Sequence, residues 1–254
     1  MQNVRDPCAL CFKSDHKINR TVAGCNLNSL QERFSNIKNR IERASRAAGR
    51  PDGSVFLIAV SKRQTVEAMA QLASLGQRDF GESYLQEALD KQAKLAGQPD
   101  VASLVWHFIG PIQSNKTRGI AENFSWVHSV DRPKIAQRLN DQRPVELPPL
   151  NVLIEVNIDG EASKSGVTPE QLPEMVGIFR DLPRLKLMGL MVIPAPGSSD
   201  GFRRLAALNA SLESPLPVLS MGMSDDFEAA IAAGSTHVRV GSALFGPRRQ
   251  EGES

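Results

Sequence analysis

The sequence is poor in cysteine, and its few cysteines are confined to one end. Cys8, Cys11 and Cys25 all fall within the first 25 of the 254 residues. The segment "CALC", taken with His16 and Cys25, has too long a spacing for a usual metal knuckle, and an isolated C-x-x-C pair is weak support for a metal site. We therefore expect no metal, and we interpret residues 1–26 as a disordered leader.

Long apolar runs and an excess of charge of one sign are also missing. No uncharged apolar run approaches the roughly 20 residues needed to span a bilayer. The first residues, "MQNVRDPCALCFKSDHKINR", are too polar for the core of a signal peptide. The formal net charge is only +2, which gives no reason to expect a nucleic-acid or membrane partner. These absences predict a soluble, cytoplasmic protein.

What the sequence does contain is a regular alternation of apolar and amphipathic segments. A leading helix is expected to begin with Ser29 as its cap and to end at Gly49, with apolar residues at helical spacing: Leu30, Phe34, Ile37 and Ile41. Strand candidates are Val55–Val60, Asp79–Phe80, Val105–Ile109, Trp126–Val130, Asn151–Ile158, Leu185–Met191, Val218–Ser220 and His237–Val240. Helical candidates between them are Thr65–Leu75, Tyr84–Leu95, Asn115–Glu122, Arg132–Asn140, Pro169–Arg180, Phe202–Leu212 and Asp225–Ala233.

This alternation indicates an α/β protein with a parallel sheet buried on both faces. Eight strand candidates within about 220 residues favour a single closed (β/α)8 TIM barrel over residues 27–248, followed by a tail at 249–254. An open doubly wound sheet is the alternative. It is weakened because no Gly-x-Gly-x-x-Gly turn follows the first strand.

The chemistry of such a barrel lies at the C-terminal ends of its strands, and two of these ends suit a phosphate. The segment "SMGMSDDFEAAIAAG" follows the seventh strand, where Gly222 permits close backbone approach and Ser224 is expected to cap the next helix. The segment "RVGSALFG" ends the eighth strand, where Gly241 and Ser242 can offer N–H groups and a hydroxyl. Ordinary helix capping would explain either loop alone. The occurrence of both, at the two strands whose loops often bind phosphate, favours a phosphate site.

A lysine, Lys62, stands at the end of the first strand. Partial desolvation and neighbouring cations would destabilise its ammonium and make its amine a usable nucleophile. Such an amine can form a Schiff base with an aldehyde, and a phosphate on the same face suggests pyridoxal 5'-phosphate (PLP). Pairing with a carboxylate such as Glu82 is an equally simple interpretation. Arg239 on the last strand could face a pyridine nitrogen and keep it unprotonated, or it could form a strand–helix salt bridge.

Longer stretches resemble a known family. "FLIAVSKRQTVEAMAQL", "WHFIGPIQSNKTR", "VLIEVNIDGEASKSGV" and "SMGMSDDFEAAIAAGSTHVRVGSALFG" are similar to the PLP homeostasis proteins, relatives of the alanine racemase barrel, over residues 27 to 247. The resemblance implies a single fold-type III barrel that holds PLP covalently on Lys62. It also implies that Arg239 faces the pyridine nitrogen and that the phosphate is held by Ser224, Gly241 and Ser242. Ser220 and Met221 would lie beside the cofactor.

The role that this resemblance implies is to bind, buffer and deliver PLP in vitamin B6 and amino-acid homeostasis, without robust catalysis. We expect a monomer, with PLP-dependent apoenzymes as recipients of the cofactor. The chain ends seven residues after Pro247, so we expect no second domain of the alanine racemase kind to close the site, and its one tyrosine is Tyr84. The alternatives are a weak PLP-dependent racemase or decarboxylase that uses Lys62 as its sole base, and an aldolase-like barrel acting on sugar phosphates.

Four other residues bear on the site. "GES" stands where the family has "GEN", so Ser83 puts one expected cofactor contact in doubt. His107, within "WHFIG", is interpreted as a satisfied core residue rather than a catalyst. Lys116 is expected to open a helix and Lys164 to lie on a solvated loop. Neither is therefore preferred over the first-strand lysine for the covalent bond.

Overall fold

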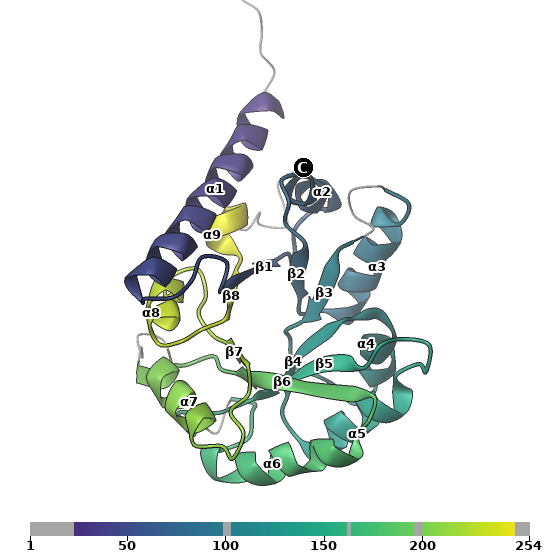
Figure 1. Cartoon of the computed structure of the whole chain (residues 1–254). Helices are drawn as coiled ribbons and strands as arrows, with labels where there is room; N and C mark the ends of the chain where they lie inside the picture. Colours follow the sequence, from purple (N-terminus) through teal and green to yellow (C-terminus); the bar gives the residue numbers. More distant parts are fainter. Residues whose placement is uncertain (1–22, 99–102, 162–163, 196–199, 247–254) are drawn as a thin grey trace, which may run out of the picture.

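The computed structural model describes residues 23–98, 103–161, 164–195 and 200–246, which form a closed parallel barrel (Figure 1). The eight strands pair in chain order, and the first closes the barrel against the last. Their bounds are β1 Phe56–Val60, β2 Asp79–Glu82, β3 Val105–Phe108, β4 Trp126–Val130, β5 Leu150–Glu155, β6 Leu185–Met191, β7 Val218–Ser220 and β8 His237–Val240. The prediction of a (β/α)8 barrel is confirmed.

Helices surround the strands on the outside of the barrel (Figure 1). They are α1 Ala23–Ala47, α2 Val66–Ser74, α3 Leu85–Leu95, α4 Thr117–Asn123, α5 Pro133–Gln142, α6 Leu172–Ile178, α7 Asp200–Ala210, α8 Phe227–Ala232 and α9 Ser242–Phe245. Short 3-10 turns at Pro169–Gln171 and Phe179–Asp181 flank α6. Thr65 caps α2 by accepting the Ala68 N–H at 3.3 Å, which explains why that helix begins where the sequence indicates.

The leading helix begins earlier than expected. Because α1 runs from Ala23, Ser29 lies within the helix and the prediction that it is the N-cap is wrong. Residues 23–26 of the predicted leader are helical, while residues 1–22, with Cys8 and Cys11, lie outside the described residues. The far end agrees with the prediction, since Gly49 adopts a φ of 68° just after the helix.

The apolar stripe of α1 faces the barrel wall. Leu30, Phe34, Ile37 and Ile41 are all buried, as their spacing predicts. They belong to one apolar cluster with residues of β1, α2, β2, α8 and β8. The helix therefore packs over the seam where β1 meets β8, beside α8 and α9 (Figure 1). This packing supports the part of the barrel in which Lys62 and Arg239 lie.

The interior of the barrel is more polar than the apolar strand segments suggest. His107, His128, His237 and Arg239 are all buried there. The three histidine rings and Trp126 lie against one another, with ring centroids 5.2 to 6.4 Å apart. Side chains alternate between the faces of a strand, so residues two apart on β4 and on β8 both point inward. The interior thus carries hydrogen-bonding groups that need partners within the barrel.

No helix among the described residues is long and apolar enough to cross a membrane. In the same part of the chain, no three histidine, cysteine, aspartate or glutamate side chains form a group that could hold a metal ion. The C-x-x-C segment lies outside this part of the chain, so the expectation about it stays a prediction.

Candidate functional site

Ser224 joins the two loops that the sequence assigns to a phosphate. Its hydroxyl oxygen accepts the N–H groups of Gly241 and Ala243, each at 3.3 Å. The prediction that Ser224 caps the next helix is wrong, because α8 begins at Phe227 with Asp226 as its N-cap residue. The loop after β8 engages the Ser224 hydroxyl instead, so residues far apart in the sequence form one polar cluster.

The cluster is rich in donors. Within the described part of the chain, the backbone N–H groups of Ser224 and Ser242 donate to no acceptor. Gly222 adopts a φ of 92°, and a Cβ atom there would lie 2.6 Å from the Ala230 Cβ. Only glycine allows the loop to pass this close to α8. The two loops therefore gather N–H and O–H groups of the kind that bind an anion.

Lys62 lies beside this cluster because β1 pairs with β8. A Cβ atom built on Gly241 would lie 3.4 Å from the Val60 Cβ, so the end of β1 adjoins the loop after β8. The half-buried Lys62 follows two residues later. Next along the chain, Arg63 has a φ of 60°, the only positive φ of a described residue other than glycine. This backbone conformation is unfavourable for an arginine and is held by its surroundings.

A buried ion pair supports the turn that carries Lys62. Glu82 Oε1 accepts hydrogen bonds from Lys91 Nζ at 2.8 Å and from the Ser61 hydroxyl at 2.7 Å. Lys91 also donates to the Ser61 carbonyl and to Glu87, both at 2.6 Å. Burial raises the pKa of Glu82, while Lys91 opposes that rise. The carboxylate considered as a partner for Lys62 thus pairs with a different lysine.

Arg239 is held inside the barrel mouth by two hydrogen bonds. Its Nη1 donates to the Ser220 hydroxyl at 2.7 Å and its Nη2 to the Val192 carbonyl at 3.0 Å. Among the described residues it makes no salt bridge, so the strand–helix salt bridge considered from the sequence is not formed. Burial lowers the pKa of Arg239 to about 10, with Glu155 opposing. The guanidinium therefore remains a cation at neutral pH.

Glu155, which ends β5, is a site residue that was not predicted from the sequence. Burial and, to a smaller extent, the nearby Asp131 raise the pKa of its carboxyl to about 7, against the opposing effect of Arg239. Only its position at a strand end could have indicated it from the sequence, because the residues that shift its pKa lie just after β4 and on β8. Because the pKa of this carboxyl lies near neutral pH, the charge at this end of the barrel, beside Arg239, can change with pH.

We expect Glu155→Gln to flatten the pH dependence of stability. The folded-state pKa of about 7 exceeds the value of 4.5 for an unperturbed carboxyl, so the folded protein binds the proton more tightly. This contribution to the free energy of unfolding is fully present below about pH 4.5 and is lost as pH rises through 7, amounting to at most about 3 kcal/mol.

Urea unfolding from pH 4.5 to 8 measures the difference in the free energy of unfolding between variant and wild type. The exposed Glu174→Gln on α6 is the control. A difference that does not vary with pH would refute the assignment.

The other residues named from the sequence have defined positions in the structure. Ser220 and Met221 are buried at the end of β7 and just beyond it, next to Gly222. Lys116 is the N-cap residue of α4, as expected, and Lys164 pairs with Glu161 at 2.9 Å. His107 is fully buried with both ring nitrogens hydrogen-bonded, so its interpretation as a satisfied core residue is confirmed.

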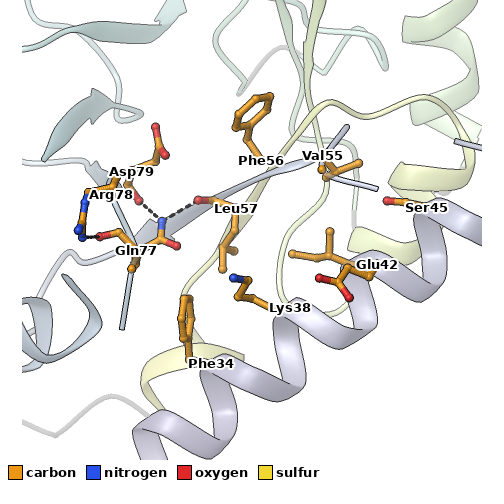
Figure 2. A pocket seen from close by; sticks show the side chains of 13 residues that line it. Phe34, Lys38, Glu42, Ser45, Val55, Phe56, Leu57, Gln77, Arg78 and Asp79 are labelled. Atoms are coloured by element: carbon orange, nitrogen blue, oxygen red, sulfur yellow. Dashed lines mark hydrogen bonds between the residues drawn. The ribbon is translucent and has the colours of Figure 1, made fainter. Parts of the chain in front are cut away.

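A cavity of about 360 Å³ lies at the opposite, N-terminal end of the barrel (Figure 2). It is lined by α1, by the start of β1 and by the residues that lead into β2. Gln77 closes one wall by donating to the carbonyls of Leu57 at 2.8 Å and Asp79 at 2.6 Å. This cavity is remote in the fold from Lys62, so the candidate site is the cluster at the strand ends.

Most of the chain is similar to known proteins. Residues 33–249 match the family model described as alanine racemase, N-terminal domain. A pyridoxal phosphate homeostasis protein of Pseudomonas aeruginosa is 55% identical over 227 residues, covering 87% of this chain and 97% of that protein. One of Escherichia coli strain K12 is 48% identical over 230 residues, covering 87% and 98%.

A solved structure of PipY from Synechococcus elongatus with PLP bound is also similar. It has a TM-score of 0.71 and 35% identity, covering 82% of this chain and all of that one. The similarity thus spans nearly the whole length of these three relatives. The chain is a member of the alanine racemase N-terminal domain family and, within it, of the pyridoxal phosphate homeostasis proteins.

Proposed function

We propose that this protein binds PLP reversibly on Lys62 and acts in PLP homeostasis as a carrier and buffer. The observation that carries the proposal is the meeting of three features at one barrel end. These are the lysine after β1, the donors around Ser224 and Ser242, and the buried cation of Arg239. The names of the relatives and the PLP in the PipY structure support the same assignment.

The residues present fit this cofactor. The glycine at position 222 leaves space where any side chain would collide with α8, and the N–H groups of Ser224 and Ser242 have no protein acceptor within the described ranges. Ser224, Gly241 and Ser242 would hold the phosphate, with Ser220 and Met221 beside the ring. When bound, PLP supplies an aldehyde that a primary amine can capture and a ring that can withdraw electrons.

The residues of the chain would restrain that chemistry. The Lys62 amine would form the covalent bond to the aldehyde carbon with loss of water. Arg239 would present a permanent positive charge to the pyridine nitrogen, which disfavours protonation of that nitrogen and weakens electron withdrawal. The one tyrosine, Tyr84, is 49% exposed beside Arg63 and so is poorly placed to act as a desolvated second base. Cytoplasmic location, a monomeric state and delivery to apoenzymes remain predictions from the sequence.

Reduction with borohydride tests the covalent bond. Purified protein is saturated with PLP, reduced, digested and mapped by mass spectrometry, and we expect the pyridoxyl label on Lys62. A label on Lys116 or Lys164, or no label, would contradict the proposal. Incubation of the PLP-loaded protein with L- and D-amino acids separates a carrier from a racemase or decarboxylase. Sustained turnover well above that of free PLP would overturn the carrier role.

A further inference from the structure

A chain of hydrogen bonds crosses the barrel interior from the wall of the N-terminal cavity to Arg239. Asp79 Oδ1 lies 3.0 Å from His107 Nε2, and His107 Nδ1 lies 3.0 Å from His128 Nε2. His128 Nδ1 lies 2.9 Å from the Ser220 Oγ, to which Arg239 Nη1 donates at 2.7 Å. The five side chains come from β2, β3, β4, β7 and β8, so the chain connects opposite sides of the barrel. We call these residues the relay.

The two ends of the relay leave one possible direction for its protons. The Asp79 carboxylate can only accept, so His107 donates to it from Nε2 and, as a neutral ring, accepts at Nδ1 from His128 Nε2. The neutral His128 ring in turn accepts at Nδ1, so the Ser220 hydroxyl donates to it while the same oxygen accepts from Arg239. The guanidinium at the other end can only donate, which agrees with this order. Both rings are thus assigned as the Nε2–H tautomer.

Burial keeps the two rings neutral, as the order requires. Desolvation lowers the pKa of His107, with Asp79 opposing, and it lowers the pKa of His128 well below the usual range. A doubly protonated ring would have to donate at both nitrogens, which would leave the Ser220 proton without an acceptor. His237 lies in the same cluster of rings but outside the relay, and it contacts the Thr236 hydroxyl at 2.9 Å.

We propose that Asp79, His107 and His128 are positioning residues for Arg239, acting by holding the Ser220 hydroxyl as an acceptor. Without the relay the hydroxyl could rotate, and Arg239 would keep only its bond to the Val192 carbonyl as a fixed contact. The consequence for the cofactor rests on the proposed function, in which the guanidinium faces the pyridine nitrogen. Aligned hydrogen bonds strengthen one another in a low-dielectric interior, so the effect of Asp79 can extend to the far end.

Asp79 offers the sharpest place to test the relay, because it is remote from the cofactor residues. Its side chain is 29% exposed at the wall of the cavity (Figure 2), so substitutions there should fold. Asp79→Asn retains an oxygen that accepts from His107, whereas Asp79→Leu removes the acceptor and frees His107 to change tautomer. His237→Phe is the matched control, since it alters a buried ring of the same cluster that lies outside the relay.

The first measurement needs no cofactor. The chain has four histidines, so long-range proton–nitrogen correlation spectra of histidine-labelled protein can resolve the rings. We expect the Nε2–H tautomer at His107 and His128 in wild type, Asp79→Asn and His237→Phe, and a second tautomer in Asp79→Leu. Exchange of the Arg239 guanidinium protons with solvent should be faster in Asp79→Leu alone. The Arg239 signals are assigned by their loss in Arg239→Lys.

The second measurement is the dissociation constant of PLP. We expect Asp79→Leu to raise it about tenfold, as for the loss of a hydrogen bond to a charged group, with Asp79→Asn and His237→Phe close to wild type. An Nδ1–H tautomer at either relay ring in wild type would overturn the inference. So would an Asp79→Leu protein whose Arg239 exchange and PLP affinity match wild type. If the tautomers are as expected and Arg239 exchange is faster in Asp79→Leu, but the wild-type protein binds no PLP, the relay stands and the proposed function fails.

Discussion

Lys62→Ala is expected to abolish covalent binding of PLP while leaving the barrel folded. The substitution removes the amine at the end of β1 but leaves the donors around Ser224, which belong to other loops. PLP should then bind only non-covalently and should be removed by gel filtration. Because Lys62 is only partly buried, its truncation should change the free energy of unfolding by less than about 1 kcal/mol. Visible absorbance after gel filtration and urea unfolding measure the two effects.

Two other lysines provide the controls for this experiment. Lys116 opens α4 and Lys164 pairs with Glu161, so replacing either with alanine should leave the bound PLP in place. If Lys62→Ala retains the visible absorbance of bound PLP while Lys116→Ala or Lys164→Ala loses it, another lysine carries the cofactor. If Lys62→Ala fails to fold, Lys62→Arg tests the same loss, because a guanidinium keeps the charge but cannot act as the nucleophile.

Lys91→Met is expected to destabilise the protein by about 3–5 kcal/mol, the usual cost of leaving a buried charge without its partner. The Glu82 side chain is fully buried, and Lys91 is the cation bonded to it. The Glu82 Oε2 atom has no hydrogen-bond partner among the described residues, so the loss would leave the carboxylate with the Ser61 hydroxyl. The midpoint of urea unfolding and its slope give the change.

Companion variants separate a lost charge pair from lost packing. Lys94→Met alters an exposed lysine on the same helix and should change stability by less than about 0.5 kcal/mol. Glu82→Gln combined with Lys91→Met removes both charges, so it should recover a large part of the loss. A double variant as unstable as Lys91→Met alone would show that packing, not the unpaired carboxylate, sets the cost. Since Lys91 also binds the Ser61 carbonyl, we expect its loss to weaken PLP binding as well.

The helix and strand pattern was largely predictable because it depends on local periodicity. The buried stripe of α1 and the end of the helix at Gly49 follow from spacing and from glycine's tolerance of positive φ. Helix starts were less predictable. Ser29 and Ser224 are both chemically suitable caps, but the first lies within a longer helix and the second bonds to another loop. Such competition between partners depends on what tertiary packing brings near.

The sequence alone determined the barrel, the lysine at the end of its first strand and the glycine- and serine-rich ends of its last two strands. The individual strands and helices, the lysine and the loop residues are local features, and the number and alternation of the strands and helices favoured a closed barrel. Only the tertiary structure decided that Glu82 pairs with Lys91, that Glu155 lies near Arg239, and that His128 links His107 to Ser220. Barrel closure sets these contacts by bringing together strands that are distant in sequence, and burial then requires each polar group to find a partner.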